Sequence, residues 1–528
     1  MIPYFAASVF ISLALGAFLL WRCGRERPAS LLIAAAPVVF TLAAWFAVCQ
    51  VFAAPVFIWN EVRLTPSFGL KFGYPLYPGP GEGPVNGHIY GPIPVLIYYA
   101  ATIFNNPTPA IFFGTALTAL MFALPPIVLV ALRWPKGISR LAAASMAGFF
   151  LLASTSLSAL WYVAFSIHVD VVALMFGALA CAALISDLSE VKRYALASVL
   201  AMLGLWSKQV LLPLVALLPF LAAMLDGRAG FVRCTLVLLP SALLVSAALV
   251  LLFGPWQNIW YNLVTIPGGH PMTDGAGAFA IELALQCLLP LLICALPIIS
   301  CLRASPRPPL REFARANRWI VFLAAGLASF PLSVMGRAKL GGDVNAYSYV
   351  LYFLYLAALL CIIDRIAALN ELRGKARALV PIGALAVVTA CGVSVHNYVR
   401  ERDGHMYDYR ISLTEQSFEQ ARTNPGRVYF ASNPLSVLLA EGKLYHFDYG
   451  LFDRDLAGRM PTRAEFLAHV PPGARALVVR RSHINYAPAF YVCRLTMQMY
   501  HADIYEIIRL AGDAPGLKTR IGLRPASE

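Results

Sequence analysis

The chain has 528 residues, of which 59% are hydrophobic and only 13% are charged, and its formal net charge is +14. A soluble domain carries about 25% charged residues, so this composition excludes a soluble globular protein and predicts a polytopic α-helical membrane protein. The positive charges are spread over short loops without a basic and aromatic stripe, which excludes nucleic-acid binding as their explanation.

Apolar runs long enough to cross a bilayer, which needs about 20 residues, predict about twelve transmembrane helices. These runs are residues 4–21, 31–57, 110–132, 141–157, 164–186, 194–206, 209–225, 234–253, 278–302, 319–335, 348–363 and 378–395. The first run lacks the basic start and the small-residue cleavage site of a signal peptide. Residues 1–30 are therefore expected to form an additional N-terminal helix and a cytoplasmic loop before a membrane domain over residues 31–395.

Charge asymmetry between the loops predicts the orientation of the chain. One set of loops carries most of the lysines and arginines, at positions 22–27, 133–140, 192–193, 228–233, 303–318 and 365–377. The opposite set holds only Arg63, Lys71, Lys208, Arg337 and Lys339. The positive-inside rule places the first set in the cytoplasm and the second set on the outer face. This assignment requires that residues 91–104 lie along the membrane surface as an interfacial helix instead of crossing it.

The last part of the chain, residues 396–528, is richer in charged and turn-forming residues than the membrane domain. The segments GRVYFAS, KLYHFDY and ARALVVR are typical of buried strands, whereas LSVLLAEG and the run 490–510 are typical of helices. These patterns predict a small soluble α/β domain on the outer face. Cys493 is its single cysteine, which excludes a disulfide within the domain, and the chain has no C-x-x-C pair that would indicate zinc.

Polar residues on the outer face are the candidates for chemistry. Glu61 directly follows a hydrophobic span and opens a long outer segment, residues 59–109, that is rich in Pro, Gly and Tyr. Asp170 opens another outer span, two residues after His168. Each carboxylate also has a purely structural explanation, as a surface group for Glu61 and as a favourable charge at a helix N-terminus for Asp170. Their occurrence on the same face favours a shared site in which Glu61 and Asp170 are catalytic.

Cations and aromatic residues on the same face indicate where an anion would bind. Lys208 interrupts an apolar stretch, so it either extends to the membrane surface or binds a lipid phosphate. The outer loop MGRAKLGGDVNAYSY supplies Arg337, Lys339 and Tyr347 beside two glycines, which suits a close approach to a phosphate. Weaker candidates for contacts with a sugar or an acceptor are Tyr90, His168 and His270.

The order of these elements resembles the GT-C superfamily of glycosyltransferases that use polyprenyl-phosphate sugars. The similar elements are an acidic residue in the first outer loop, a Tyr-Pro interfacial helix, an acidic residue that opens a later outer span, the segment WSKQVLLPL and a K-L…Y-x-Y-V-L loop, over about residues 31–364. Related groups are the lipid A aminoarabinose transferase, the protein O-mannosyltransferases and bacterial enzymes that add uronic acids to the lipopolysaccharide core. Asn60–Glu61 stands where many members have Asp or an acidic pair, and the run 4–21 precedes the family's first helix.

The resemblance implies transfer of a sugar at a bacterial inner membrane, with the active site and the C-terminal domain in the periplasm. It implies that Glu61 is the catalytic carboxylate and that Asp170 is a second acidic residue of the site. It also implies a donor phosphate site formed by Lys208, Arg337, Lys339 and Tyr347. A polyprenyl-phosphate leaving group is already anionic, so one base is sufficient to deprotonate the acceptor hydroxyl, and a single displacement would invert the anomeric carbon.

The expected partners are a polyprenyl-phosphate sugar, a glycan, lipid or protein acceptor of the cell envelope, and the bilayer itself. The pattern demands no cofactor, and it leaves open a divalent metal ion at Glu61, Asp170 or His270, because no metal-spacing motif is present. Two other classes share part of the pattern. A transporter or lipid flippase would place charges deep within its spans, and a lipid-linked oligosaccharide ligase or polymerase would use a diphosphate-linked donor.

Overall fold

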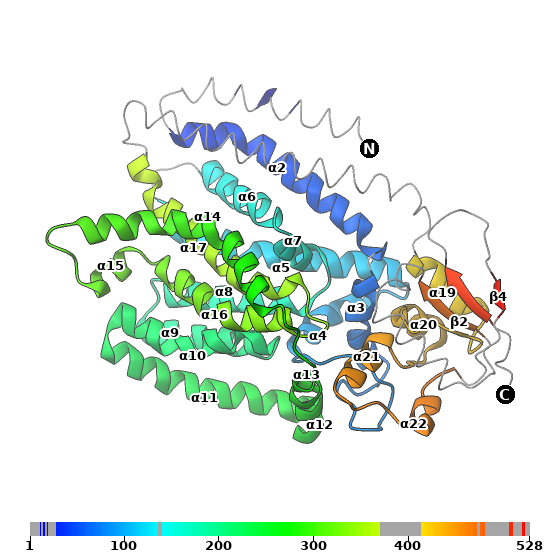
Figure 1. The fold of residues 1–528 in the computed structure, drawn as a ribbon. Coiled ribbons are helices and arrows are strands. Elements are labelled where there is room, and N and C mark those ends of the chain that lie inside the picture. The colour runs from blue at the N-terminus through cyan, green and yellow to red at the C-terminus, as the bar shows by residue number, and fades with distance from the viewer. Residues whose placement is uncertain are drawn as a thin grey trace.

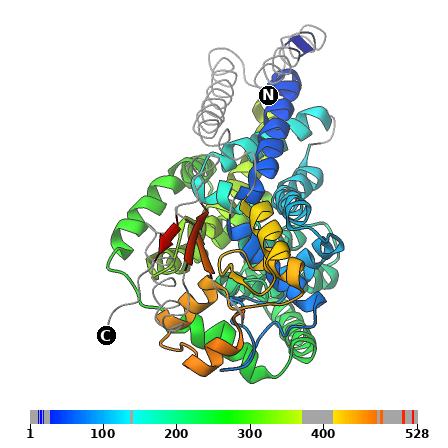
Figure 2. The same cartoon turned by 90° about the vertical axis from the view of Figure 1, so that its right-hand side faces the viewer.

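The computed structural model describes residues 28–56, 58–135, 140–369, 413–471, 476–480, 506–510 and 520–522, together with positions 11, 14, 15 and 18. Long helices lie side by side across Figure 1, and the short helices and strands of the C-terminal residues gather at its right-hand end. Figure 2 looks onto that end, which we call the outer end because the residues predicted on the outer face lie there. The opposite end is the inner end.

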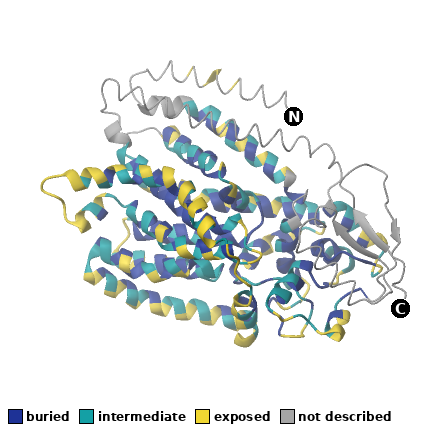
Figure 3. Cartoon of the chain, viewed as in Figure 1, coloured by how far each residue is buried: buried dark blue, intermediate teal, exposed yellow. Residues whose placement is uncertain are grey.

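Seven of the described helical segments are long and apolar enough to cross a membrane. They are α2 (Pro28–Ala53), α5 (Pro107–Arg133), η3 (Gln209–Leu211) with α10 (Leu212–Asp226), α11 (Arg228–Phe253), α14 (Ala276–Arg303), α16 (Ile320–Ala338), and η5 (Val344–Tyr347) with α17 (Ser348–Leu369). An eighth crossing results if α6 (Arg140–Thr155) and α7 (Ser158–Phe165), which are bent by 112° relative to each other, form one span. Exposed leucines along α11 and α14 (Figure 3) suit surfaces that contact lipid.

The predicted spans agree with these helices, apart from three runs that become shorter helices. The run 141–157 forms α6, of 16 residues, which reaches spanning length only together with α7. The runs 164–186 and 194–206 form α8 (Val169–Leu184) and α9 (Glu190–Leu205), each of 16 residues. Such helices are about 24 Å long, less than the apolar thickness of a bilayer. The run 378–395, and 4–21 apart from four positions, lie outside the described residues. The chain is therefore a polytopic α-helical membrane protein.

The loops that carry most of the cations meet at the inner end. Their ion pairs are Arg133–Asp364 (3.4 Å), Arg193–Asp226 (2.7 Å), Arg315–Asp226 (3.6 Å) and Arg318–Asp187 (2.9 Å). Each pair joins two different segments of the chain, mostly helix ends, so the structure groups at one end the described cations that the charge pattern assigns to the cytoplasm. Shorter helices connect the remaining elements: η1 (Ala54–Val56), α12 (Trp256–Trp260), the π-helix η4 (Tyr261–Thr265), α13 (Ile266–Gly268) and α15 (Leu310–Ala316).

The first outer segment begins with a helix, α3 (Ile58–Lys71), although Pro66 lies within it. At the predicted interfacial position, α4 (Ile93–Tyr98) continues into η2 (Tyr99–Ile103). This unit is too short to cross a bilayer. It buries Val95 and Tyr98 against the protein and exposes Leu96 and Ile103, which is the amphipathic pattern of a helix that lies along a membrane surface.

The described C-terminal residues form a mixed α/β arrangement. The helices are α19 (Leu413–Thr423), α20 (Pro434–Glu441), α21 (Asp448–Leu456) and α22 (Arg463–Ala468), and the strands are β1 (Val428–Tyr429), β2 (Ala476–Arg480), β3 (Glu506–Leu510) and β4 (Arg520–Gly522). The four strands form one sheet in the order β1-β2-β3-β4, with the first two pairs parallel and the last antiparallel. The predicted α/β class of this region is therefore confirmed for the described residues.

Two predicted C-terminal elements are wrong. KLYHFDY was expected to be a strand, but its backbone makes single hydrogen bonds with separate loops, such as Phe447 N to Val85 O and His446 N to His469 O, instead of a ladder. The end of the run 490–510 was expected to be helical, but Glu506–Leu510 is strand β3, because β2 and β4 pair with it on both sides. Residues 490–505 lie outside the described part of the chain.

The C-terminal residues and the membrane helices share one hydrophobic core. Leu435, Leu438 and Phe447 pack in the same cluster as the buried faces of α5, α8 and α17. Helix α20 lies against α3. The predicted division near residue 396 therefore marks a change in composition, while the packing across it is continuous.

Candidate functional site

A cavity of about 480 Å³ lies at the outer end, between the membrane helices and the C-terminal residues. We call it the cation cavity, because Arg63, Lys208 and Lys339 all line it. These cations come from α3, from the turn before η3, and from the end of α16. Two acids, Asp343 and Asp453, also line the cavity.

Asp170 lies behind Lys208 and is fully buried in the first turn of α8. Its Oδ1 accepts hydrogen bonds from Lys208 Nζ at 2.6 Å and from Tyr349 Oη at 2.7 Å. Its Oδ2 accepts a hydrogen bond from Asn345 Nδ2 at 2.7 Å and also contacts Nδ1 of His168. A carboxylate with this many partners cannot move freely, so Asp170 fixes Lys208 at the cavity wall. His168 and Lys208 line the cavity, whereas Asp170 supports them from behind.

The ring of Tyr90 lies between two of the cations. Cζ of Arg63 is 4.9 Å from the ring centre, and Nζ of Lys208 is 5.3 Å from it. The next residue, Gly91, lies so close to the chain that a Cβ there would be 1.6 Å from Trp206 O. Only glycine at this position lets the backbone hold Tyr90 between the two positive charges. Attraction of both cations to the aromatic face offsets part of their mutual repulsion.

Lys339 is held in the cavity by the loop that follows α13. Its backbone forms a bridge with Met272, and its Nζ donates a hydrogen bond to Pro267 O. Burial lowers the pKa of Lys339 from its ordinary value, while the charge of Asp453 acts in the opposite direction. The side chain therefore has a carbonyl partner but no ion pair with a carboxylate among the described residues.

Asp453, on α21, is an acidic group of the cavity with a strongly shifted pKa. Burial raises its pKa to about 7, although the charges of Arg63, Arg454 and Lys339 oppose this change. Nε2 of His270 lies 3.7 Å from Oδ1 of Asp453. Burial lowers the pKa of His270 to about 4, so this imidazole is neutral at pH 7. The cavity thus contains a carboxyl group that gains and loses its proton near neutral pH.

Glu61 lies outside the cavity lining and is fully buried against the C-terminal residues. Its Oε1 accepts a hydrogen bond from Ser436 N at 2.7 Å, and its Oε2 accepts others from Asn433 Nδ2 at 2.8 Å and Thr414 Oγ1 at 3.1 Å. Ser436 N belongs to the first turn of α20, so Glu61 caps that helix from a distant part of the sequence. The catalytic role of Glu61 stays a prediction, and the structure does not bring its carboxylate into the cavity.

Helix geometry explains why Glu61 and Arg63 have different surroundings. Side chains that are two positions apart on an α-helix point in directions about 200° apart. Arg63 therefore faces the cavity together with Trp59 and Val62, while Glu61 faces α20.

The predicted phosphate loop is divided in the structure. Lys339 lines the cation cavity, but Arg337 and Tyr347 do not. Tyr347 Oη instead donates to Glu282 Oε2 at 3.0 Å, on α14. The guanidinium of Arg337 lies over the ring of Phe279 at 4.7 Å and donates to Gly342 O at 2.8 Å. Among the candidates, the structure brings Tyr90, His168, Lys208, His270 and Lys339 together, and leaves Arg337 and Tyr347 on another side of the loop.

No group of three His, Cys, Asp or Glu side chains gathers as a metal site within the described ranges. The residues at which a divalent ion was left open each have separate partners. Glu61 contacts α20, Asp170 pairs with Lys208, and His270 faces Asp453. A metal ion is therefore not assigned to any of them.

Two residues of the cavity were not singled out from the sequence. Arg63 is one of the few outer cations in the sequence, but the interpretation assigned a functional role to Glu61, two positions before it. Asp453 lies in GLFDRDLAG, which gives no local signal, because its position in the cavity arises only when α21 packs against the outer loops.

The fold and the cavity define the class of the molecule: a polytopic helical membrane protein with a cation-lined cavity at one end. No protein-family model and no curated protein matches the sequence. Among solved structures, the chain is similar to ArnT from Cupriavidus metallidurans bound to undecaprenyl phosphate, with 16% identity, a TM-score of 0.40, and coverage of 82% of this chain and 73% of that one. It is also similar to the archaeal oligosaccharyltransferase AglB from Archaeoglobus fulgidus, in complex with an inhibitory peptide and a dolichol-phosphate. That similarity has 13% identity, a TM-score of 0.37, and coverage of 89% of this chain and 69% of that one.

Proposed function

We propose that this protein is a membrane glycosyltransferase of the GT-C type, which transfers a sugar from a polyprenyl-phosphate donor to an acceptor of the cell envelope. The observation that carries the proposal is the convergence of Arg63, Lys208 and Lys339 on one cavity at an end of the membrane helices. Lys208 is paired with Asp170, but Arg63 and Lys339 have no ion pair with a carboxylate among the described residues, and cations buried near a bilayer are costly without an anionic partner. A lipid phosphate is such a partner, because its lipid part stays in the bilayer and holds the negatively charged phosphate at the membrane surface.

The donor would bind with its phosphate near the three cations and its lipid along the apolar part of the wall. Leu263, Val264 and Leu332 line the same cavity and come from η4 and α16. Hydrogen bonds between a charged donor and a phosphate are short and about twice as strong as neutral ones. As the bond from the sugar to the phosphate breaks, negative charge grows on the bridging oxygen, and Lys208, fixed by Asp170, is suited to stabilise it.

Asp453 is the group best suited to act as the base. A general base is most effective when its pKa lies near the working pH, and burial gives Asp453 a pKa of about 7. The anionic leaving group needs no protonation, so Asp453 only has to remove the proton of the acceptor hydroxyl. The oxygen then attacks the anomeric carbon from the side opposite the phosphate, and the product has inverted configuration. His270, which is neutral, lies 3.7 Å from Asp453 and flanks that carboxylate in the cavity.

The proposed location is the inner membrane of a bacterium, with the cation cavity on the periplasmic face. The grouping of the paired cations at the opposite end supports this orientation through the positive-inside rule. The acceptor would then be a glycan, lipid or protein that is exposed at the periplasmic surface.

Binding of undecaprenyl phosphate to the full-length protein in nanodiscs tests the donor site. Arg63→Ala and Lys339→Ala should each weaken binding about tenfold or more, because a hydrogen bond to a charged group contributes about 1.5–3 kcal/mol. The neutral alcohol undecaprenol should bind more weakly than the phosphate in the wild type, and both variants should reduce that preference.

Arg233→Ala is the matched control, because Arg233 is an exposed cation at the inner end that pairs with Glu190. Its binding of undecaprenyl phosphate should equal that of the wild type. Equal affinity for the phosphate and the alcohol in the wild type, or unchanged binding in both cavity variants, would remove the basis of the proposal.

A further inference from the structure

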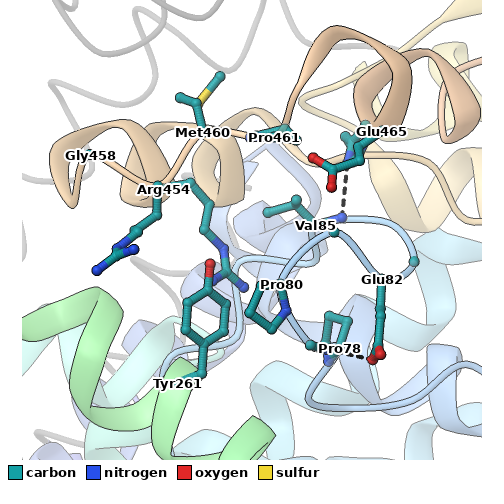
Figure 4. Close-up of a pocket in the computed structure, with 15 residues that line it drawn as sticks. Pro78, Pro80, Glu82, Val85, Tyr261, Arg454, Gly458, Met460, Pro461 and Glu465 are labelled. Atoms are coloured by element: carbon teal, nitrogen blue, oxygen red, sulfur yellow. Dashed lines mark hydrogen bonds between the residues drawn. The ribbon is translucent and has the colours of Figure 1, made fainter.

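A second cavity, of about 330 Å³, lies beside the cation cavity at the outer end (Figure 4). One wall is the glycine-rich turn 78–83 of the first outer segment, and the other, within residues 454–465, is formed by the end of α21, the connection to α22 and the first turn of α22. Tyr261, on the π-helix η4, also lines it. We call it the glycine-turn cavity. It has no part in the donor site described above.

Arg454 is the most informative residue of the glycine-turn cavity. Its side chain is nearly fully buried, with 6% of the residue exposed. Nη2 donates to Asn262 Oδ1 at 2.7 Å, and the guanidinium lies 4.4 Å above the ring centre of Tyr261. Within the described part of the chain, Nη1 is buried without a hydrogen-bond partner. An unsatisfied buried donor is costly, so this nitrogen indicates that an acceptor atom of a ligand belongs beside it.

Two carboxylates are held at the same cavity by one oxygen each. Oε2 of Glu82 accepts a hydrogen bond from Gly79 N at 3.1 Å. Oε2 of Glu465 accepts one from Thr462 N at 2.7 Å, within the capping box of α22. For the residues that the structure describes, neither Oε1 has a hydrogen bond. Each carboxylate is thus oriented by the protein and keeps an acceptor for a ligand.

Glycine at position 81 lets the turn approach Glu465. Gly81 has a φ of +73°, and a Cβ there would lie 2.3 Å from Oε1 of Glu465. A larger residue would be strained in this conformation and would displace the carboxylate. The turn and the carboxylate are therefore built to fit each other.

The charges of the cavity indicate the chemistry of its ligand. Two carboxylates, Glu82 and Glu465, are balanced by two guanidinium groups, Arg454 and Arg459. A strongly anionic or cationic ligand would meet repulsion from one of these pairs. A hydroxyl group both donates and accepts, so it can pair with a carboxylate and with a guanidinium at once. The ring of Tyr261 adds an apolar face on which the C–H groups of a sugar ring can pack.

We propose that the glycine-turn cavity binds a neutral saccharide, as the acceptor subsite of the transferase proposed above. This inference rests on the proposed function for its role as acceptor. Asp453, which lines the cation cavity, and Arg454, which lines the glycine-turn cavity, are consecutive on α21. On η4, Tyr261 lines the glycine-turn cavity and Leu263 lines the cation cavity. A saccharide seated on Arg454 would thus extend around α21, by about 100° of the helix, toward the base.

Neutral disaccharides test the subsite in the full-length protein in nanodiscs. Cellobiose, N,N′-diacetylchitobiose and mannobiose serve as the probes, and saturation-transfer NMR reports their binding. At least one should bind the wild type, and Tyr261→Leu should weaken its binding roughly two- to tenfold, the range for loss of an aromatic packing partner. Glu465→Gln should also weaken it, while glutamine retains the capping box, so folding is preserved.

Glu419→Gln is the control, because Glu419 is exposed on α19, where it pairs with Arg422. Binding of undecaprenyl phosphate is measured with the same variants and should not change, which separates this inference from the donor proposal. The inference is overturned if none of the disaccharides binds, or if Tyr261→Leu and Glu465→Gln leave their binding unchanged. Preferential binding of a proline- and glycine-rich tetrapeptide over the disaccharides would overturn it as well.

Discussion

The two ends of the membrane helices use positive charge in different ways. At the inner end, Arg133, Arg193 and Arg318 each form an ion pair with a carboxylate from another segment of the chain. At the outer end, Arg63 and Lys339 have aromatic or carbonyl partners, but no ion pair within the described residues. Several of the inner cations are thus compensated by carboxylates, so they describe orientation and packing. The outer cations are few and only partly compensated by negative charge, so they indicate where a negatively charged ligand would bind.

Asp453 gives the largest expected effect at the outer end. Asp453→Asn should lower transfer about 10²–10⁴-fold, which is the range for loss of a general base. In the wild type, transfer should rise as the pH increases through about 7, because only the deprotonated carboxylate accepts a proton and burial raises the pKa of Asp453 to about 7. The variant should lack this rise. The measurement is transfer of a radiolabelled sugar from a polyprenyl-phosphate donor in membranes, as a function of pH.

Asp455→Asn is the control for this prediction, because Asp455 lies on the same helix but does not line the cation cavity. It should keep both the rate and the pH profile. A pH profile that is identical in the wild type and Asp453→Asn would assign the base to another residue.

Glu61 should give the next largest effect, on stability instead of on turnover. Glu61→Gln weakens the charge-assisted hydrogen bonds to Ser436, Asn433 and Thr414, so it should lower the free energy of unfolding by about 1.5–3 kcal/mol. Limited proteolysis of the C-terminal residues and thermal unfolding in detergent measure this change. Turnover per folded molecule should stay near the wild-type value. Normal stability with lost turnover would instead show that Glu61 is the base that the sequence pattern predicts.

Lys208 should give the smallest of the three effects, on donor binding. Lys208→Ala should weaken binding of undecaprenyl phosphate about tenfold, which is about 1.4 kcal/mol. Asp170 keeps its bonds to Tyr349 and Asn345, so the fold should persist. Lys208→Arg should restore only part of the affinity, because a planar fork replaces a compact ammonium group. Titration of the phosphate lipid into nanodiscs gives the affinity, and an unchanged value in Lys208→Ala would assign Lys208 to the membrane surface alone.

Those features of the fold that depend on local composition could be predicted from the sequence. The apolar runs locate the long helices, and the loop charges separate the two ends, because both signals are contained in short stretches of chain. KLYHFDY shows the limit of this approach. Its alternating pattern suits a strand, but its backbone partners, such as Val85, lie hundreds of residues away. The strand β3 was missed for the same reason, since its neighbours β2 and β4 decide its conformation.

The site was predictable only in part, for a related reason. Lys208 and Lys339 could be identified because a cation is rare in its surroundings, whether in an apolar run or in an outer loop. The choice between Glu61 and Arg63 depends on which side of α3 faces the cavity, and the sequence of the helix alone does not specify this. Asp453 enters the site through the packing of α21, so no motif near it could have indicated its role.

The cap that Glu61 provides for α20 has a consequence for the biosynthesis of the chain. Glu61 is synthesised hundreds of residues before Ser436, so its carboxylate has to wait for its partners while the intervening helices enter the membrane. Asp453 is made later still, after all the described cations of the cavity. The cations of the cavity are therefore synthesised before Asp453, the group proposed as the base. A chain that stops before α20 leaves the carboxylate of Glu61 without its amide partners. Helices α20 and α21 are synthesised after all the described membrane helices, which ties the onset of activity to the synthesis of the C-terminal residues.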